Sequence, residues 1–337
     1  MTFPEITDFH NAKQYADAVE LPMDRGGDLE LGQVYVANDS RFTASAYNQP
    51  LTTFAVGGWN RMGLDDELRA LVGTPVQVPR RFSYKAWVNA EAFKSETTDD
   101  LRAIGADFKA VNLTNTEVET QIANRGLIMV LDADEVAEGI MTEQMAVQYL
   151  SQRLKLNQIR RAAALIVASA NDTLRAWSGS ARDPDTDMMT AINAYHIAAG
   201  IDCNTALIGR TAWTHRVTGL RGLTTAGGFA GASKTAQELA DWLNIGEVFR
   251  SNAVYQSASA TKNLVTSTKV LLFSKSTSGM REDPSNIKYF WSPVSQGGGQ
   301  IAAFRYEEGR KKIVVGVEHN ELLAVTYTGG IQTITAS

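Results

Sequence analysis

Three stretches of the sequence contain residue types whose spacing is known from catalytic or ligand-binding sites. The first, Gly228-Phe229-Ala230-Gly231-Ala232-Ser233-Lys234-Thr235, nearly matches a phosphate-binding P-loop and precedes a predicted helix. Ser233 stands where a second glycine is needed for close backbone approach to phosphate, and no clear apolar strand precedes the stretch. A flexible surface loop is therefore the favoured interpretation, and nucleotide binding is the alternative.

The second stretch, Ser259-Ala260-Thr261-Lys262, matches Ser-x-x-Lys, but no Ser-Asp-Asn or Lys-Thr-Gly element accompanies it. The third is a cluster of acidic residues that could bind a hard cation: Asp132, Asp134, Glu135 and Glu138. It lacks the glycine turn of a calcium loop, and acidic residues before a helix are also expected from the helix dipole. We interpret the second stretch as a chance match and the third as a structural feature.

The histidines and the cysteine add no reactive centre. His10, His196, His215 and His319 are widely separated and show no metal-binding spacing. The single cysteine, Cys203, excludes an intrachain disulfide framework and a thiolate metal cluster. Because no dinucleotide-binding or nucleophile-elbow motif occurs either, we expect no catalytic residue, no cofactor, no metal ion and no enzyme activity.

Composition places the chain among ordinary globular proteins. Of its 337 residues, 44% are apolar and 20% are charged, and the formal net charge is −5. A slightly acidic chain has no broad basic surface for gripping nucleic acid. The first residues lack the pattern of a signal peptide, and no run of apolar residues is long enough to span a membrane. We therefore expect a protein of cytosolic origin.

The elements that position these residues are organised around Thr142 to Asp172, which holds 31 residues without Gly or Pro. One apolar line with helical spacing comprises Met145, Tyr149, Leu156, Ile159, Ala163, Ile166 and Ala170. A second line comprises Val147, Leu150 and Leu154. Thr142 is the predicted N-cap. Such a helix is about 45 Å long, which suits a rod that crosses between subdomains or lies along a partner.

The segments before this helix are extended or polar. They are an arm over residues 1–60, a short helix at Leu64–Val72 ended by Gly73, strands at 76–79 and 82–86, a polar hairpin loop at Glu91–Lys109, and a strand from Thr120 that ends in the buried run Leu127–Leu131.

The segments after the helix alternate between helix and strand, which indicates a mixed α/β subdomain. They are an amphipathic segment at Asp187–Ala199, a strand at Asn204–Gly209, a helical turn at Thr211–Val217, the Gly-rich loop at 224–233, a helix at Thr235–Leu243, strands at Val248–Tyr255 and Lys269–Phe273, and C-terminal strands at 313–317, 322–327 and 331–334.

The order of these elements, and several short motifs, resemble the major capsid proteins of tailed bacteriophages with the Hong Kong 97-type fold. The resemblance covers residues 70–335. Its motifs are Thr74-Pro75-Val76-Gln77-Val78 before the loop, Leu101-Arg102-Ala103-Ile104-Gly105 near its tip, Leu131-Asp132 before the helix, Asn204–Gly209 with Trp213, Glu238-Leu239-Ala240, Asn244–Val248, and Asn252-Ala253-Val254-Tyr255.

The resemblance implies an α+β fold with a peripheral domain, an axial α/β domain, an extended loop and an N-terminal arm. The peripheral domain would combine an antiparallel sheet with a long spine helix, the helix at 142–172. The implied divisions are an arm at 1–60, a short helix and lead-in at 61–79, the extended loop at 80–117, the peripheral domain at 118–178, the axial domain at 179–305, and C-terminal strands at 306–337 that return to the peripheral domain.

The resemblance also implies a structural protein whose main partner is itself, in the hexamers and pentamers of an icosahedral phage head. The arm and the loop would embrace neighbouring subunits, and we predict inter-subunit contacts for Lys94 and Arg102. Lys94 and Lys109 lie in or beside the loop, but no motif identifies a cross-linking partner. Four cations of the spine helix are expected at the inner side or against a neighbour: Arg153, Lys155, Arg160 and Arg161.

Further expected partners are a separate scaffolding protein, because the arm is too short to include one, a portal, a decoration protein, and packaged double-stranded DNA bound without sequence specificity. No membrane is expected. The protein would assemble in the host bacterial cytoplasm and reside in the virion. Two alternatives remain open, an encapsulin-type nanocompartment shell and a two-domain α/β enzyme that uses the Gly-rich loop to bind a nucleotide.

Overall fold

A computed structural model of the chain describes residues 48–57, 63–87, 94, 101–102, 104–105, 107–108, 115–178, 183–223, 226–256, 261–294, 299–309 and 311–337. The chain divides into two units, Met1–Arg41 and Phe42–Ser337, and all described residues belong to the second unit. The expectations for residues 1–47, including His10, and for Lys109 lie outside the described residues. No helix within the described ranges is long and apolar enough to cross a bilayer.

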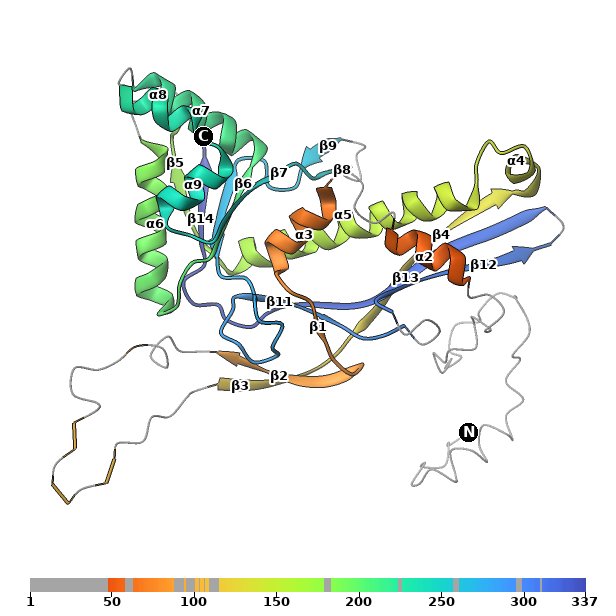
Figure 1. The fold of residues 1–337 in the computed structure, drawn as a ribbon, viewed down its shortest axis with the longest axis horizontal. Helices are drawn as coiled ribbons and strands as arrows, with labels where there is room; N and C mark the ends of the chain where they lie inside the picture. The colour runs from red at the N-terminus through yellow and green to blue at the C-terminus, as the bar shows by residue number, and fades with distance from the viewer. Residues whose placement is uncertain are drawn as a thin grey trace, which may run out of the picture. The chain divides into compact units, whose positions relative to one another are not determined.

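The long helix α5 runs over Glu143–Ser169 (Figure 1). It begins as predicted, because the Thr142 side chain accepts a hydrogen bond from the Met145 N–H at 3.2 Å. The predicted end at Asp172 is wrong. Asn171–Arg175 instead form strand β5, which pairs in parallel with strand β14 (Gln332–Ala336). A strand partner distant in sequence overrides the local helical pattern at this point.

The buried face of α5 also differs from the prediction in its first half. Met145 and Tyr149 are 38% and 48% exposed. The line predicted to be secondary is the buried one in this half: Val147, Leu150 and Leu154. In the second half the predicted line is buried: Ile159, Ala163 and Ile166. The reason is that the two halves pack against different partners, and one straight line of side chains cannot face both.

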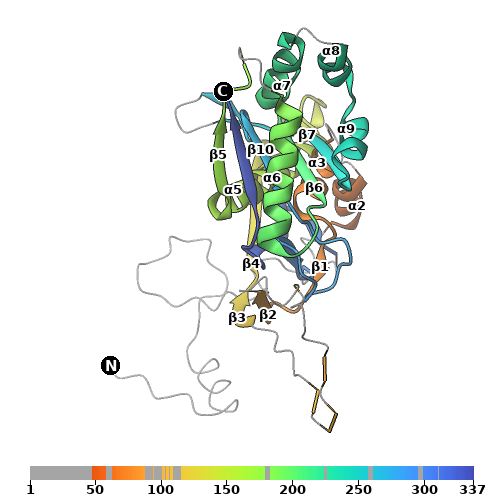
Figure 2. The ribbon, with the colours of Figure 1, turned by 90° about the vertical axis from the view of Figure 1, so that its left-hand side faces the viewer.

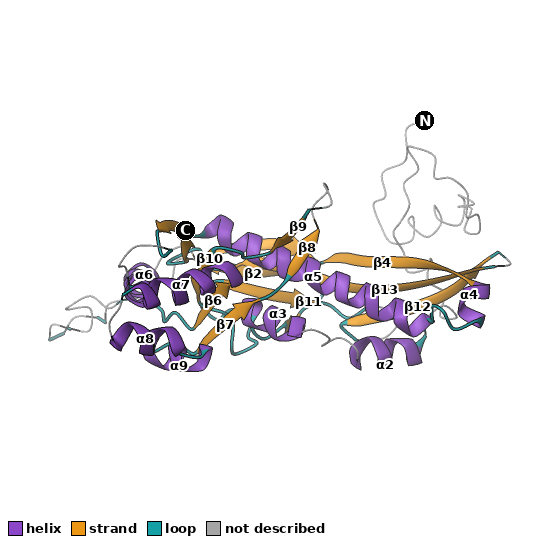
Figure 3. Cartoon of the chain, turned by 90° about the horizontal axis from the view of Figure 1, so that it is seen from above, coloured by secondary structure: helices purple, strands orange, loops and turns teal. Residues whose placement is uncertain are grey.

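The first half of α5 lies on a sheet with strand order β1-β11-β13-β12, in which β4 also pairs with β13 (Figure 3). The strands are β1 (Val76–Gln77), β4 (Ala123–Asp132), β11 (Ile287–Trp291), β12 (Ile301–Glu308) and β13 (Lys312–Val325). All neighbouring strands are antiparallel except β1 and β11, which are parallel. Apolar residues of β4, β12 and β13 pack against α5 and helix α2 (Gln49–Gly57).

Three expectations for these segments need correction. Residues 49–57, expected in an extended arm, form helix α2, because Leu51 and Ala55 find a buried site against the sheet. The two strands expected at 313–317 and 322–327 are one strand, since the residues between them pair with the start of β4. The run Leu127–Leu131 is only half buried, because α5 covers one face of β4 and leaves Ile128 and Val130 exposed.

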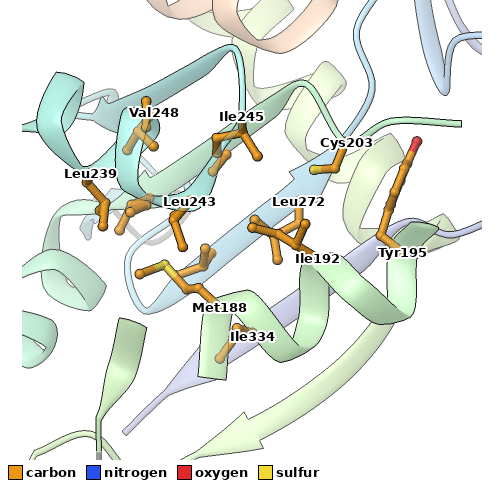
Figure 4. Packing of buried hydrophobic residues seen from close by; sticks show 14 of the residues in the cluster. Met188, Ile192, Tyr195, Cys203, Leu239, Leu243, Ile245, Val248, Leu272 and Ile334 are labelled. Atoms are coloured by element: carbon orange, nitrogen blue, oxygen red, sulfur yellow. The ribbon is translucent and has the colours of Figure 1, made fainter. Parts of the chain in front are cut away.

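The second sheet has strand order β5-β14-β10-β6-β7 (Figure 2). Its central strands are β10 (Lys269–Phe273) and β6 (Thr205–Gly209), with β7 (Glu247–Ser251) at the edge opposite β5. Helices α6 (Pro184–Ala199), α7 (Arg210–Gly222) and α9 (Ala236–Leu243) cover one face, and Figure 4 shows apolar side chains from α6 and α9 meeting those of the sheet. Helix α3 (Leu64–Val72) and the second half of α5 pack on the other face.

The helices and strands of this half mostly lie where the sequence predicts them, with four differences. The predicted turn at Thr211–Val217 is the longer helix α7, and the Gly-rich loop contains helix α8 (Ala226–Ser233). The predicted strand at Val248–Tyr255 is divided into β7 and β8 (Val254–Gln256), which pairs with β9 (Lys262–Leu264). The C-terminal segment is divided between the sheets, because β13 lies in the first and β14 in the second.

Helix α3 ends as predicted. Gly73 adopts a φ of 69° and its N–H donates to the Arg69 carbonyl. A Cβ at this position would lie 1.9 Å from the Ser276 carbonyl oxygen, so glycine is required for two reasons. A short helix at residues 133–137 forms α4, and strands β2 (Arg81–Trp87) and β3 (Asn115–Gln121) form the antiparallel base of the hairpin.

Candidate functional site

The Gly-rich stretch does not form a phosphate cradle. Its glycines lie mostly within α8, and the helix that follows is capped by its own residues. The Thr235 N–H donates to Glu238 Oε2 at 2.7 Å, and the Glu238 N–H donates to Thr235 Oγ1 at 3.2 Å. The Thr235 N–H at the start of α9 is therefore already satisfied by Glu238, and residues 226–233 form a helix where the sequence favoured a flexible surface loop.

Two residues of the acidic cluster have structural partners, and the cysteine is buried. Asp132 caps α4 by accepting a hydrogen bond from the Asp134 N–H at 2.9 Å, and Asp134 pairs with Lys311. No group of His, Cys, Asp and Glu that could hold a metal ion occurs within the described ranges. Cys203 is buried, and burial raises the pKa of its thiol to about 12.

The remaining motif and histidines lie apart from one another. Ser259 lies outside the described residues, whereas Lys262 lies in β9. His196 and His215 lie on α6 and α7, and His319 lies in β13.

The base of the extended hairpin is held firmly against the first sheet. The rings of Phe82 and Tyr84 lie 4.9 and 5.4 Å from the ring of Phe290 on β11. At the far end of β2, the Trp87 N–H donates to the Thr326 carbonyl at 2.8 Å. Residues 88–114 therefore connect two strands whose position is fixed by packing, as predicted from the alternating pattern of residues 82–86.

The described part of the loop presents apolar side chains to solvent. Leu101, Ile104 and Phe108 are 78%, 106% and 78% exposed. Gly105 supplies a turn with a φ of 83°, and the guanidinium of Arg102 lies 4.8 Å from the centre of the Phe108 ring. The tip is thus locally organised while its apolar surface lacks a partner among the described residues.

The two residues predicted to contact a neighbouring subunit have contacts within the chain. Arg102 lies over Phe108, and the Lys94 ammonium donates to the Ile197 carbonyl at 2.5 Å, in the last turn of α6. Carbonyls in the last helical turn lack intrahelical partners, so a cation is favourable there. Neither contact tests the assignment to a neighbouring subunit, which stays a prediction.

A second apolar surface lies on the face of the first sheet that points away from α5. Strand register aligns Ile128 with Gly316 and Phe304, and Val130 with Val314 and Tyr306. Aligned residues of neighbouring strands point to the same face. Ile128, Val130 and Tyr306 are 58%, 51% and 39% exposed, and we call these three residues the outer sheet patch.

The four cations of α5 divide into two pairs. Arg153 and Arg160 are exposed, and the guanidinium of Arg160 lies 4.9 Å from the centre of the Tyr255 ring. Lys155, expected on the surface, is fully buried and donates to Asp65 of α3, so that expectation is wrong for Lys155. Burial lowers the pKa of this ammonium to about 8, although Asp65 opposes the shift.

The fourth cation, Arg161, donates to the buried carboxylate of Glu321 on β13. Gln158 also donates to this carboxylate at 2.7 Å, and Arg125 and His319 lie within 3.2 and 3.3 Å of it. Burial acts to raise the pKa of Glu321, but these contacts outweigh burial and lower it.

Two buried polar residues were missed by sequence reasoning. Asn286 lies between the two sheets, where its amide oxygen accepts hydrogen bonds and its amide nitrogen donates them. Glu67 of α3 accepts hydrogen bonds from the Ser251 hydroxyl and the Asn252 N–H. Burial raises the pKa of Glu67 against these hydrogen bonds. No local signal marks either residue, because Asn before a strand and Glu in a helix are ordinary surface choices.

Comparisons with known proteins point to one fold. Neither protein-family models nor curated protein sequences give a match for this chain. Among solved structures, a phage-related protein from Bordetella bronchiseptica is 16% identical with a TM-score of 0.62, covering 87% of this chain and 97% of its own. The virus-like particle from Pyrococcus furiosus is 10% identical with a TM-score of 0.52, covering 85% of this chain and 98% of its own.

These two structures are similar over nearly their whole length, so the likeness concerns the complete fold and not one subdomain. The expected fold class is confirmed: the chain has a mixed α+β fold of the Hong Kong 97 capsid type.

Proposed function

We propose that this chain is the major capsid protein of a tailed bacteriophage, and that it self-associates into an icosahedral shell enclosing double-stranded DNA. The supporting observation is a pair of exposed apolar surfaces, the loop tip at Leu101, Ile104 and Phe108 and the outer sheet patch. They occur on a fold similar to that of a virus-like particle. Contiguous apolar surface left exposed by a subunit is typical of an association surface.

Burial of these exposed apolar side chains favours association between copies of the chain. Burying a large apolar side chain stabilises a complex by about 1.5–3 kcal/mol, before the cost of ordering is subtracted. The loop tip holds three such side chains, and the outer sheet patch holds three more. A subunit that keeps these residues in water as a monomer gains this free energy when another copy covers them.

The partners follow from this role. The chain would form hexamers and pentamers with itself, assisted by a separate scaffolding protein, a portal and a decoration protein. Assembly would take place in the cytoplasm of a bacterial host, and the mature protein would reside in the virion. We also propose a structural role without enzyme activity, and the capping box at the start of α9, in which Glu238 satisfies the Thr235 N–H, is consistent with it.

Electron microscopy of the purified chain, with and without its scaffolding partner, tests the proposal. We expect shells or capsomer rings for the native chain. The triple variant Leu101→Ser, Ile104→Ser, Phe108→Ser should shift the population toward smaller species, because the apolar contribution of the tip is lost. A strictly monomeric native chain at high concentration would contradict the proposal.

A matched control uses exposed apolar residues elsewhere. Phe229 and Met280 are 58% and 68% exposed, and Phe229→Ser with Met280→Ser should leave assembly unchanged. If the loop-tip variant and this control lost assembly equally, the loss would reflect general surface hydrophobicity and not the loop tip. The contents of purified shells separate the two kinds of shell: nucleic acid supports a phage head, and an enzyme cargo supports the encapsulin-type alternative.

A further inference from the structure

Helix α5 concentrates positive charge in a chain that is acidic overall. It contains four basic residues and one acidic residue, whereas the whole chain has a formal net charge of −5. Lys155 and Arg161 turn toward Asp65 and Glu321 and hold the helix to its neighbours. Arg153 and Arg160 remain on the exposed side, so only these two are available to an external partner.

Three acidic residues on or beside α5 are already engaged in ion pairs. Asp65 pairs with Lys155, Glu321 with Arg161 and Arg125, and Glu143 with Arg305 at 2.7 Å. Within the described ranges, no ion pair to a carboxylate is formed by Arg153 or Arg160. The exposed side of α5 therefore carries a positive charge that no carboxylate in the described part of the chain neutralises.

Aromatic residues accompany the two arginines. Tyr149, 48% exposed, precedes Arg153 by one helical turn. The guanidinium of Arg160 lies 4.9 Å from the centre of the Tyr255 ring on β8, which fixes the position of its charge. The β8–β9 hairpin lies beside α5 and adds the exposed cation Lys262 (Figures 1 and 3).

We propose that this line of Tyr149, Arg153 and Arg160, with Tyr255, contacts the phosphate backbone of the enclosed double-stranded nucleic acid. The proposal rests on the proposed function and names the surface that meets the shell's contents. Two arginines separated by seven residues lie about 10 Å apart along the helix axis, so both can reach phosphates of one duplex. Contacts to phosphate carry no sequence information, which matches an enclosed genome.

The part of the line after Arg153 lacks exposed side chains that are large and apolar. After Arg153, the exposed residues along the line are Arg160, Ala164 and Ala168. Protein–protein interfaces are enriched in arginine, methionine and aromatic residues and depleted of alanine. The exposed side chains of this half are one guanidinium group and two methyl groups. The arginine fits either kind of partner, whereas the two alanines favour nucleic acid.

The test measures binding of the full chain to a short DNA duplex by fluorescence anisotropy between about 50 and 200 mM salt. We expect Arg153→Gln with Arg160→Gln to reduce the slope of log K against log salt by roughly 1.8, since each lost phosphate contact removes about 0.9. The control is Arg210→Gln with Arg221→Gln, which removes the same charge from exposed positions on α7.

The proposal would be overturned by native protein that does not bind the duplex, by an unchanged slope in the α5 variant, or by an equal change in the control. Stronger competition by polyglutamate than by duplex DNA would also overturn it, because the line would then suit an acidic protein. Electron microscopy of the same variants keeps the two proposals apart. Shells that form normally while duplex binding does not depend on Arg153 and Arg160 refute only the DNA surface.

Discussion

The phenol of Tyr195 on α6 donates a 2.7 Å hydrogen bond to Oδ1 of Asn286, where the chain passes from the second sheet to the first. The same oxygen accepts from the Ser274 N–H at 2.7 Å. The Asn286 amide nitrogen donates to the carbonyls of Tyr327 and Gly329, on the return passage from the first sheet to the second. One fully buried side chain therefore ties together both passages between the sheets and helix α6.

Asn286→Asp should destabilise the fold strongly, by roughly 3 kcal/mol or more, because a buried carboxylate would face two carbonyls that it cannot satisfy. Tyr195→Phe should cost only about 1 kcal/mol, since Oδ1 of Asn286 keeps its bond from the Ser274 N–H. Urea denaturation gives both values. Hydrogen exchange should rise mainly around residues 326–330 in Asn286→Asp, and uniform exchange throughout the chain would contradict this assignment.

Lys155→Met should stabilise the protein at pH 7, by about 1–3 kcal/mol, because an apolar side chain replaces a fully buried ammonium while Asp65, 31% exposed, remains open to hydration. The pKa of Lys155 is lowered to about 8 by burial, so keeping the ammonium charged in the folded state is costly near neutrality. Between pH 8 and the ordinary lysine range, the unfolded chain binds more protons at this residue than the folded chain does. The contribution of Lys155 to native stability therefore rises with pH over this interval.

The advantage of Lys155→Met should accordingly shrink as the pH is raised from 7 to 10. Denaturation of native protein and variant at both pH values measures this difference. Arg153→Met is the matched control, because Arg153 is exposed on the same helix and should give no pH-dependent difference. An advantage of equal size at pH 7 and pH 10 would show that packing, and not the charge, determines the effect.

Glu321→Gln should destabilise the protein at pH 7, by about 2–3 kcal/mol, because several donors lose a buried negative partner. The folded-state pKa of Glu321 lies below its ordinary value, so its stabilisation is fully present above that value. It is lost as the pH falls through the folded-state pKa. The difference between native protein and variant should therefore shrink on acidification, as measured by urea denaturation.

The control for Glu321 is Glu307→Gln. Glu307 also pairs with an arginine, at 2.9 Å, but its side chain is 62% exposed. Exposed ion pairs contribute about 0–1 kcal/mol, so this variant should differ little from the native protein at any pH. A Glu321 variant as mild as this control would mean that the buried cluster does not hold α5 to β13.

Local features of the fold were predictable because they depend on neighbours in sequence. The Thr142 cap, the end of α3 at Gly73 and the strand Lys269–Phe273 all appear where the pattern places them. A cap, a left-handed glycine and an apolar run each carry their physical cause within a few residues. The order of such elements was sufficient to suggest the capsid fold.

Errors occurred where a distant partner decides the outcome. Asn171 and Asp172 leave the helix because β14 pairs with them, and residues 318–321 join two predicted strands because β4 lies beside them. Helical periodicity suggested that Met145 and Tyr149 are buried, but the sheet lies under the other line of α5. Sequence patterns report which residues can share a face, and packing selects the face.

The sequence by itself determined the types and order of the elements, the long polar loop before the spine helix, and the lack of a recognisable catalytic pattern. Tertiary structure alone decided which charges are structural and which are free. Lys155 and Arg160 are similar cations on one helix, yet Lys155 is buried against Asp65 and Arg160 is exposed over Tyr255. The physical reason is that burial and pairing depend on side chains brought together from α3, β8 and β13, whose positions no local pattern specifies.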